Sequence, residues 1–177
     1  LFPRDHGLHC IELRTSRFFP EADDNREIRE AYADAHVKAN EFLYRRVDIA
    51  DVVSAHLLAS QLAPTLGFRK YIVSATTPFT RDDLAALRTD APGVVSRRVP
   101  GWEAEYARRG WKMFPGIDRV YVNDRARQEL GWRPRYDFAQ VLASLRANQD
   151  PRSALAQAIG AKGYHDRIFV NEPYPVE

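Results

Sequence analysis

The stretch RQELGWRPRYDF, residues 127–138, predicts a helix that stops, a turn, and the start of a second helix. Gly131 can adopt the left-handed conformation that closes a helix, and Pro134 prevents the helix from continuing. Trp132 can fold back onto the helix, and Asp137 is placed to cap the next one. Since every residue has a structural role, we predict that this stretch organises the fold and contributes no catalytic group.

Two other stretches have the pattern of core strands, residues 9–15 and 70–75. Because helical patterns alternate with them, the sequence predicts an α/β fold. Shorter extended pieces are expected at residues 45–49, 93–99 and 119–122. Helices are expected at residues 24–44, 50–63, 80–92 and 101–111, and from Asn123, Asp137 and Asp150 onward.

Polar residues precede two of these helices at N-cap positions. Asp48 and Asp51 have the spacing of a capping box, and so do Thr80 and Asp83. In a capping box the first side chain accepts from the helix backbone and the second accepts from the cap backbone. The pattern therefore predicts where both helices begin.

The number of central strands is small for an α/β domain. Two strands do not form a sheet that is stable alone. The first ten residues, LFPRDHGLHC, contain no clean start signal. We therefore expect the remaining strands to belong to an N-terminal half that is missing from this sequence.

Composition bears on the class of protein. The 177 residues are 45% hydrophobic and 28% charged, as in globular domains, and no apolar run approaches the roughly 20 residues that span a bilayer. The 26 basic residues are interleaved with 24 acidic ones, so we expect neither membrane nor nucleic acid as a partner. Cys10 is the only cysteine, which favours a reducing, cytoplasmic compartment.

Local clusters give little sign of metal or nucleophilic chemistry. His6, His9 and Cys10 are potential metal ligands, but His9 and Cys10 are neighbours on a predicted strand and point to opposite faces. We therefore expect no metal site. No Gly-x-Ser-x-Gly elbow occurs, and Cys10 is interpreted as a strand residue of the core.

Four segments together resemble one family, the extended short-chain dehydrogenases/reductases, also called NAD-dependent epimerases/dehydratases. RARQELGWRPRYDF (125–138) resembles the Leu-Gly-Trp-x-Pro segment near the family's C-terminus, and RVDIADVVSAHLLA (46–59) its Val-x-Val-x-Asp-Val-Ala stretch. IELRTSRFFPE (11–21) is similar to the family's strand that ends in Leu-Arg before an aromatic turn. KYIVSATTPFTRDDLAAL (70–87) is similar to its late strand, polar loop and capped helix.

The resemblance implies an architecture. Residues 1–150 would form the C-terminal part of a Rossmann-like doubly wound sheet together with a mostly helical substrate-binding lobe. Residues 151–177 would form a C-terminal helix and an irregular arm. The segments match only the second half of the family's pattern, so the cofactor-binding half would lie outside these residues.

The resemblance also implies NAD or NADP as cofactor. The nine glycines nowhere form the family's glycine-rich phosphate loop, and no tyrosine is followed by a lysine four residues on, as the family's Tyr-x-x-x-Lys pair requires. These groups bind the pyrophosphate and transfer the substrate's proton. We therefore assign no catalytic residue and expect the chain to be inactive alone.

Site residues follow from position in the family pattern. Thr15 and Ser16 match the loop that passes the nicotinamide end of the cofactor. Arg17 stands where the family often has an asparagine that touches substrate, a departure that favours a more acidic or otherwise different substrate. The expected substrate-binding residues are Arg17, Arg45, Arg46, Arg98 and Arg119.

Two functional hypotheses remain open. In the first, the chain is the substrate-binding half of an NAD(P)-dependent epimerase, dehydratase or oxidoreductase that acts on a small sugar-like or anionic molecule. In the second, it is a truncated paralogue or split subunit that acts as a non-catalytic interaction module. An open sheet edge could pair with an N-terminal half or with another copy of the chain.

Overall fold

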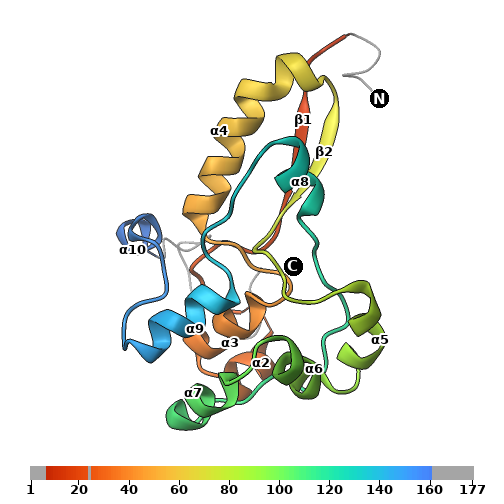
Figure 1. Cartoon of the computed structure of the whole chain (residues 1–177). Coiled ribbons are helices and arrows are strands. Elements are labelled where there is room, and N and C mark those ends of the chain that lie inside the picture. Colours follow the sequence, from red (N-terminus) through yellow and green to blue (C-terminus); the bar gives the residue numbers. More distant parts are fainter. Residues whose placement is uncertain (1–6, 24, 161–177) are drawn as a thin grey trace, which may run out of the picture.

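The computed structural model describes residues 7–23 and 25–160, and shows a mixed α/β fold (Figure 1). Its sheet has two parallel strands, β1 (Ile11–Thr15) and β2 (Arg69–Val73), which pair from Ile11 opposite Arg69 to Thr15 opposite Val73. Helix α4 (Ile49–Leu66) lies along the strands and leads into β2. Both predicted core strands are therefore confirmed, with slightly shorter bounds.

Helix α4 begins where its sequence predicts but continues three residues beyond the predicted end at residue 63, with Pro64 inside it. The Asp48 carboxylate accepts from the backbone N–H of Ala50 at 2.8 Å, which confirms Asp48 as the N-cap. At the other end Gly67 has a φ of 66°, a conformation that glycine adopts without strain. Apolar residues of the helix, Val52 and Ala55 among them, belong to the core beneath the strands.

The stretch 127–138 packs against β2 and α4, in the same core cluster. Helix α8 (Asp124–Glu129) contacts β2, and Gly131 follows it with a φ of 65°. Trp132 is fully buried, and its indole N–H lies 3.1 Å from the carbonyl of Asp51 and 2.9 Å from the hydroxyl of Ser54. The predicted helix stop and turn are confirmed, and the tryptophan joins this turn to α4.

Asp51 has a different role from the one its spacing suggests. Its carboxylate does not complete a capping box with Asp48 but accepts from the backbone N–H groups of Arg135 and Tyr136, 84 and 85 residues away. Burial raises the pKa of Asp51, although these two N–H groups oppose the shift. The carboxylate thus holds the turn after Trp132 against the first turn of α4.

Most of the other helices form a helical lobe that lies below the sheet in Figure 1. Its core is rich in aromatic residues: Tyr106 and Trp102 meet edge to face, and the Tyr106 hydroxyl donates to the Asn40 side chain at 2.9 Å. The lobe contains α2 (Arg26–Ala31), α3 (Asp34–Glu41), α5 (Leu84–Leu87), α6 (Ala91–Arg98), α7 (Trp102–Arg109) and α9 (Phe138–Arg146).

The first long helix of the prediction is two helices. Tyr32 and Ala33 have extended backbone, with ψ angles of 136° and 147°, and they separate α2 from α3. Asn25 caps α2 by accepting from Glu27 and Ile28. The single helix over residues 24–44 is therefore wrong, because a continuous apolar stripe is compatible with two short helices that pack on one core.

Two predicted strands of the helical lobe are also wrong. Residues 93–99 fall largely in helix α6, where the Asp90 carboxylate accepts from the backbone N–H of Gly93 and Pro92 occupies the first turn. Residues 119–122 form no strand, although the backbone N–H of Tyr121 donates to the carbonyl of Tyr44. Short β-branched runs do not distinguish a strand from one face of a buried helix.

The segment after α9 returns to the start of α4. Ser153 caps α10 (Ala154–Ile159), and its backbone N–H donates to the Asp48 carboxylate at 3.0 Å. The Asp48 carboxylate therefore accepts hydrogen bonds at the N-terminal ends of both α4 and α10. The expected arm falls mostly on residues 161–177, which lie outside the described residues.

Strand β1 has one open edge. Among the described residues it pairs only with β2. At its two ends, the carbonyl of Cys10 accepts from the backbone N–H of Arg69, and the backbone N–H of Ser16 donates to the carbonyl of Val73. Since backbone groups alternate along a strand, Ile11, Leu13 and Thr15 point their backbone N–H and C=O groups to the opposite side, away from β2.

None of the helices in residues 7–23 and 25–160 has both the length and the apolar character that a membrane-spanning helix needs.

Candidate functional site

The carboxyl ends of the two strands bring distant segments together. Directly after β1, the backbone N–H of Ser16 donates to the carbonyl of Val73, and Arg17 forms a parallel bridge with Arg46. The residues that follow β1 therefore lie beside those that precede α4. Ligands of open α/β sheets bind at this end of the strands.

A buried carboxylate organises this region. Glu41, at the end of α3, is fully buried and accepts from three guanidinium groups. The distances to its oxygens are 2.9 Å from Arg17, 3.0 Å from Arg45 and 2.9 Å from Arg46. A buried charge is stable only when it is paired in this way, so the three arginines fix the orientation of Glu41 and are fixed by it.

Asp23 completes the arginine cluster, which consists of Arg17, Arg45, Arg46, Glu41 and Asp23. Its carboxylate pairs with Arg17 and lies 3.7 Å from the Arg45 guanidinium. Burial alone would raise the pKa of Asp23, but the backbone N–H of Asn25 and the guanidinium of Arg17 hold it below its usual value. Glu41 and Asp23 raise the pKa of Arg17 against the effect of burial, so Arg17 and Asp23 are both ionised at neutral pH.

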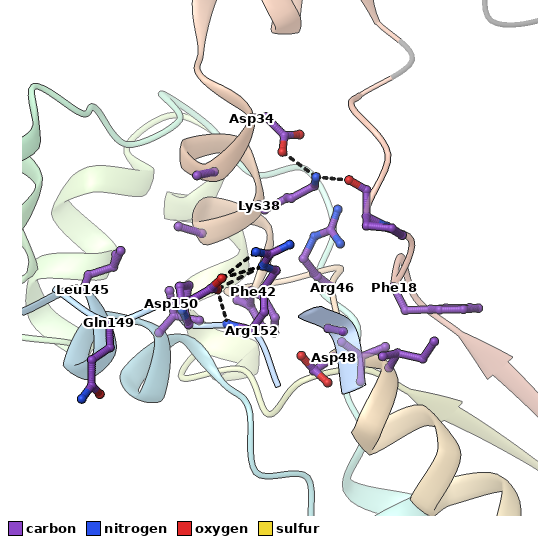
Figure 2. Close-up of a pocket in the computed structure, with 18 of the residues that line it drawn as sticks. Phe18, Asp34, Lys38, Phe42, Arg46, Asp48, Leu145, Gln149, Asp150 and Arg152 are labelled. Atoms are coloured by element: carbon purple, nitrogen blue, oxygen red, sulfur yellow. Dashed lines mark hydrogen bonds and ion pairs between the residues drawn. The ribbon is translucent and has the colours of Figure 1, made fainter. Parts of the chain in front are cut away.

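A cavity of about 620 Å³ lies beside this cluster, between the loop after β1, helix α3 and the segment from α9 to α10. Figure 2 shows Lys38 beside Asp34 and the chain after β1 on one side, and Asp150 with Arg152 on another. The volume of this cavity is within the range of cavities that bind drug-sized ligands. The wall of the cavity includes Phe18, Phe42, Arg46, Asp48, Trp111, Val141 and Leu145.

A second cavity of about 280 Å³ lies on the other side of the cluster. Arg17, Asp23 and Glu41 line it, and it shares Lys38 and Arg46 with the larger cavity. Acidic and basic groups therefore face each other across a small space. We take the larger cavity, with its apolar wall, as the candidate functional site.

The structure brings together three of the five arginines that the family pattern singles out. Arg17, Arg45 and Arg46 form the arginine cluster, and Arg46 also lines the candidate site. Arg98 lies on α6, where it pairs with Asp83 at 2.8 Å. Arg119 is largely exposed beside Asp118, and neither Arg98 nor Arg119 lines the cavity.

Asp83 belongs to the predicted capping box. Its carboxylate accepts from both the backbone and the hydroxyl of Thr80 at 2.8 and 3.0 Å, which confirms the pairing of these two residues. Arg98 adds two bonds to the same carboxylate. Arg98 therefore stabilises the capping box at the residues that precede α5.

The two residues expected to contact the cofactor differ in exposure. Thr15 is exposed at the end of β1, whereas Ser16 is buried and its hydroxyl has no hydrogen-bond partner among the described residues. A buried hydroxyl without a partner is costly unless a ligand or water satisfies it. The Ser16 hydroxyl is therefore available for one polar contact to a ligand or water, and the sequence has no glycine-rich loop that would bind a pyrophosphate.

Sequence reasoning missed most of the cavity wall. Lys38, Phe42 and Trp111 were not singled out, because their positions in helical or loop segments give no sign of a common cavity. The rings of Phe18 and Phe19 are 4.1 Å apart beside the cavity. Val141 and Leu145 lie one helical turn apart on α9, a spacing that indicates a buried face without showing what that face contacts.

Searches for relatives and for metal sites give no further assignment. Within the described residues, no group of three or more histidine, cysteine, aspartate or glutamate side chains could hold a metal ion. No family model, curated protein or solved structure matches this chain.

Proposed function

We propose that this chain is the substrate-binding half of an NAD(P)-dependent epimerase, dehydratase or oxidoreductase of the extended short-chain dehydrogenase/reductase type. One observation carries the proposal: a parallel strand–helix–strand unit places the loop after β1 beside a cavity at the strands' carboxyl ends. This is where α/β enzymes of the doubly wound class bind their ligands. Three of the four family-like segments supply the two strands and the helix of that unit.

The open edge of β1 indicates how the cofactor would be supplied. The backbone groups of Ile11, Leu13 and Thr15 suit another strand, and with it the doubly wound sheet would continue. Strands added there would carry the phosphate loop and the Tyr-x-x-x-Lys pair. Thr15 and Ser16 would then lie where the sheet meets the cofactor, and the present chain would bind and orient the substrate.

A direct binding experiment tests the division of roles. We expect no saturable binding of NAD⁺ or NADP⁺ to these 177 residues by titration calorimetry, because the pyrophosphate has no cradle here. The nucleotide sequence that encodes the region upstream of Leu1 should contain the glycine-rich loop and the Tyr-x-x-x-Lys pair. Tight nucleotide binding by the chain alone, or an upstream region without either motif, would contradict the proposal.

A second candidate function is a non-catalytic interaction module. It is favoured by apolar side chains that α4 exposes near the open strand, Val53 at 43% and Leu57 at 61%. A partner that pairs with β1 would also cover part of this helix. Self-association in sedimentation velocity, or a partner protein in fixed stoichiometry, together with an upstream region that lacks both motifs, would favour this function over the enzyme half.

A further inference from the structure

The candidate site has four cationic side chains on its wall, and each is already paired. Lys38 contacts Asp34 at 2.6 Å, and Arg46 contacts Glu41 at 2.9 Å. Arg109 and Arg152 each lie 2.6 Å from a carboxylate, that of Glu105 and that of Asp150. The cations on this wall are therefore compensated before any ligand arrives.

The arrangement opposes an anionic ligand. Arg46 and Arg109 also donate to backbone carbonyls, of Phe19 at 3.0 Å and of Leu145 at 2.7 Å. An entering anion would meet cations whose charge these carboxylates already balance, so it would lose its hydration in a partly enclosed space for little net attraction. The guanidinium groups expected to hold an anionic substrate instead hold the protein's own carboxylates.

The rest of the wall suits a flat, apolar body. Aromatic rings come from three separate segments: Phe18 from the loop after β1, Phe42 from the end of α3, and Trp111 from the loop after α7. Val141 and Leu145 of α9 supply aliphatic surface. Such walls bind ring-bearing molecules through burial and offset or edge-to-face ring contacts.

Uncharged polar groups are also present. Asn148 and Gln149 line the cavity, directly after α9, and their amides can donate to a carbonyl or accept from a hydroxyl. Neither amide side chain needs a charged partner. They would supply the few polar contacts that orient an otherwise apolar ligand.

We propose that the candidate site binds an uncharged, ring-bearing organic molecule with hydroxyl or carbonyl groups. The identification of this molecule as the substrate rests on the proposed function. Binding itself rests only on the cavity, its aromatic wall and its paired charges. This ligand class is narrower than the expected substrate class, because it excludes the anionic and sugar-like molecules that the family resemblance favours.

A neutral fluorescent probe tests the proposal on the chain as it is. N-phenyl-1-naphthylamine should bind saturably with one site per chain at pH 7.5 and no nicotinamide nucleotide present. Its anionic analogue, 8-anilinonaphthalene-1-sulfonate, should bind at least tenfold more weakly. Since no cofactor is added, the result does not depend on whether a cofactor-binding half exists.

Two variants locate the site from different walls. Ala156→Trp on α10 and Ala35→Trp on α3 each place an indole in the cavity and should weaken probe binding at least tenfold. Ala158→Trp is the matched control, because Ala158 is exposed on α10 and does not line the cavity. Circular dichroism and urea unfolding should show that all three variants are folded.

The outcomes separate the possibilities. Tighter binding of the sulfonate would overturn the inference of an uncharged ligand. Absence of saturable binding, or equal weakening in Ala158→Trp, would overturn the site. An upstream region without the glycine-rich loop and the Tyr-x-x-x-Lys pair would remove the enzyme half but leave this binding result unchanged.

Discussion

The sheet part and the helical lobe are stabilised in different ways. In the lobe, rings from neighbouring helices and loops enclose one another: His36 stacks on Trp111 with centroids 5.0 Å apart, and Tyr106 meets both edge to face. Within the described residues, the sheet part has two strands, exposes Val53 and Leu57, and depends on Trp132 from far along the chain. A region with a closed core can tolerate the loss of one contact more easily than a region with an open edge.

The largest effect is expected at the tryptophan that closes the sheet part. Trp132→Ala removes a fully buried side chain and two hydrogen bonds to α4. We expect a loss of about 3–5 kcal/mol in the free energy of unfolding, typical of tryptophan deletion in a core. Urea denaturation followed by circular dichroism measures it. The adjacent exposed Arg133→Ala is the control and should change stability by no more than about 0.5 kcal/mol.

Asp51→Asn tests the link between α4 and the turn after Trp132. An amide keeps the shape of the side chain but replaces one acceptor oxygen by an NH₂ group and removes the negative charge that accepts from the backbone N–H groups of Arg135 and Tyr136. We expect a loss of about 2 kcal/mol, because these are buried hydrogen bonds to a charged group. Equal urea midpoints for Asp51→Asn and the wild type would contradict the assigned role, and the exposed Asp124→Asn serves as the matched carboxylate control.

The helical lobe should respond to pH through His36. Burial lowers the pKa of His36 below its usual 6.5, with an opposing contribution from its backbone bond to Lys112. The unfolded chain then binds the proton more readily than the folded chain, so this contribution to stability is present above pH 6.5 and falls below it. The free energy of unfolding should decrease as the pH is lowered from 7.5 to 5, and the decrease should be less steep in His36→Gln than in the wild type. An unchanged slope in that variant would assign the dependence to other groups.

The smallest effect on stability is expected at the exposed face of α4. Leu57→Lys removes apolar surface from a residue that is 61% exposed, so the free energy of unfolding should change by no more than about 0.5 kcal/mol. If another chain covers this face, the same variant should weaken that association in sedimentation velocity. A large loss of stability in the monomer would show that Leu57 is already packed.

The sequence predicted the parts of the fold that depend on local chemistry. The carboxylate of Asp48 caps α4, and the side chains of Thr80 and Asp83 form their capping box. Gly131 follows the end of α8 with a positive φ angle, which glycine adopts because it has no side chain. The break at Tyr32 was not predictable, because the apolar spacing of α2 continues into α3. Residues 93–99 were assigned to a strand because Val94 and Val95 are β-branched, although Asp90 stands where a helix cap belongs.

The site was less predictable than the fold. That Arg17, Arg45 and Arg46 would share one carboxylate depends on Glu41, a residue on α3 that no local pattern distinguishes. The cavity depends on the approach of the segment after α9 to the start of α4, which Asp48 and Ser153 fix over 105 residues. Such contacts arise from tertiary packing and leave no periodic trace in the sequence.

The separation of the paired strands has a consequence for how the chain folds. Ile11 and Arg69 are 58 positions apart, so β1 and β2 can meet only after the intervening loop, which contains α2, α3 and α4, has been closed. Closing a long loop costs entropy before the pairing gives any return, whereas helices form within short segments. We therefore expect the helices to form early and the two strands to pair late. During that interval both edges of β1 are exposed, and the risk of pairing with the wrong strand is greatest.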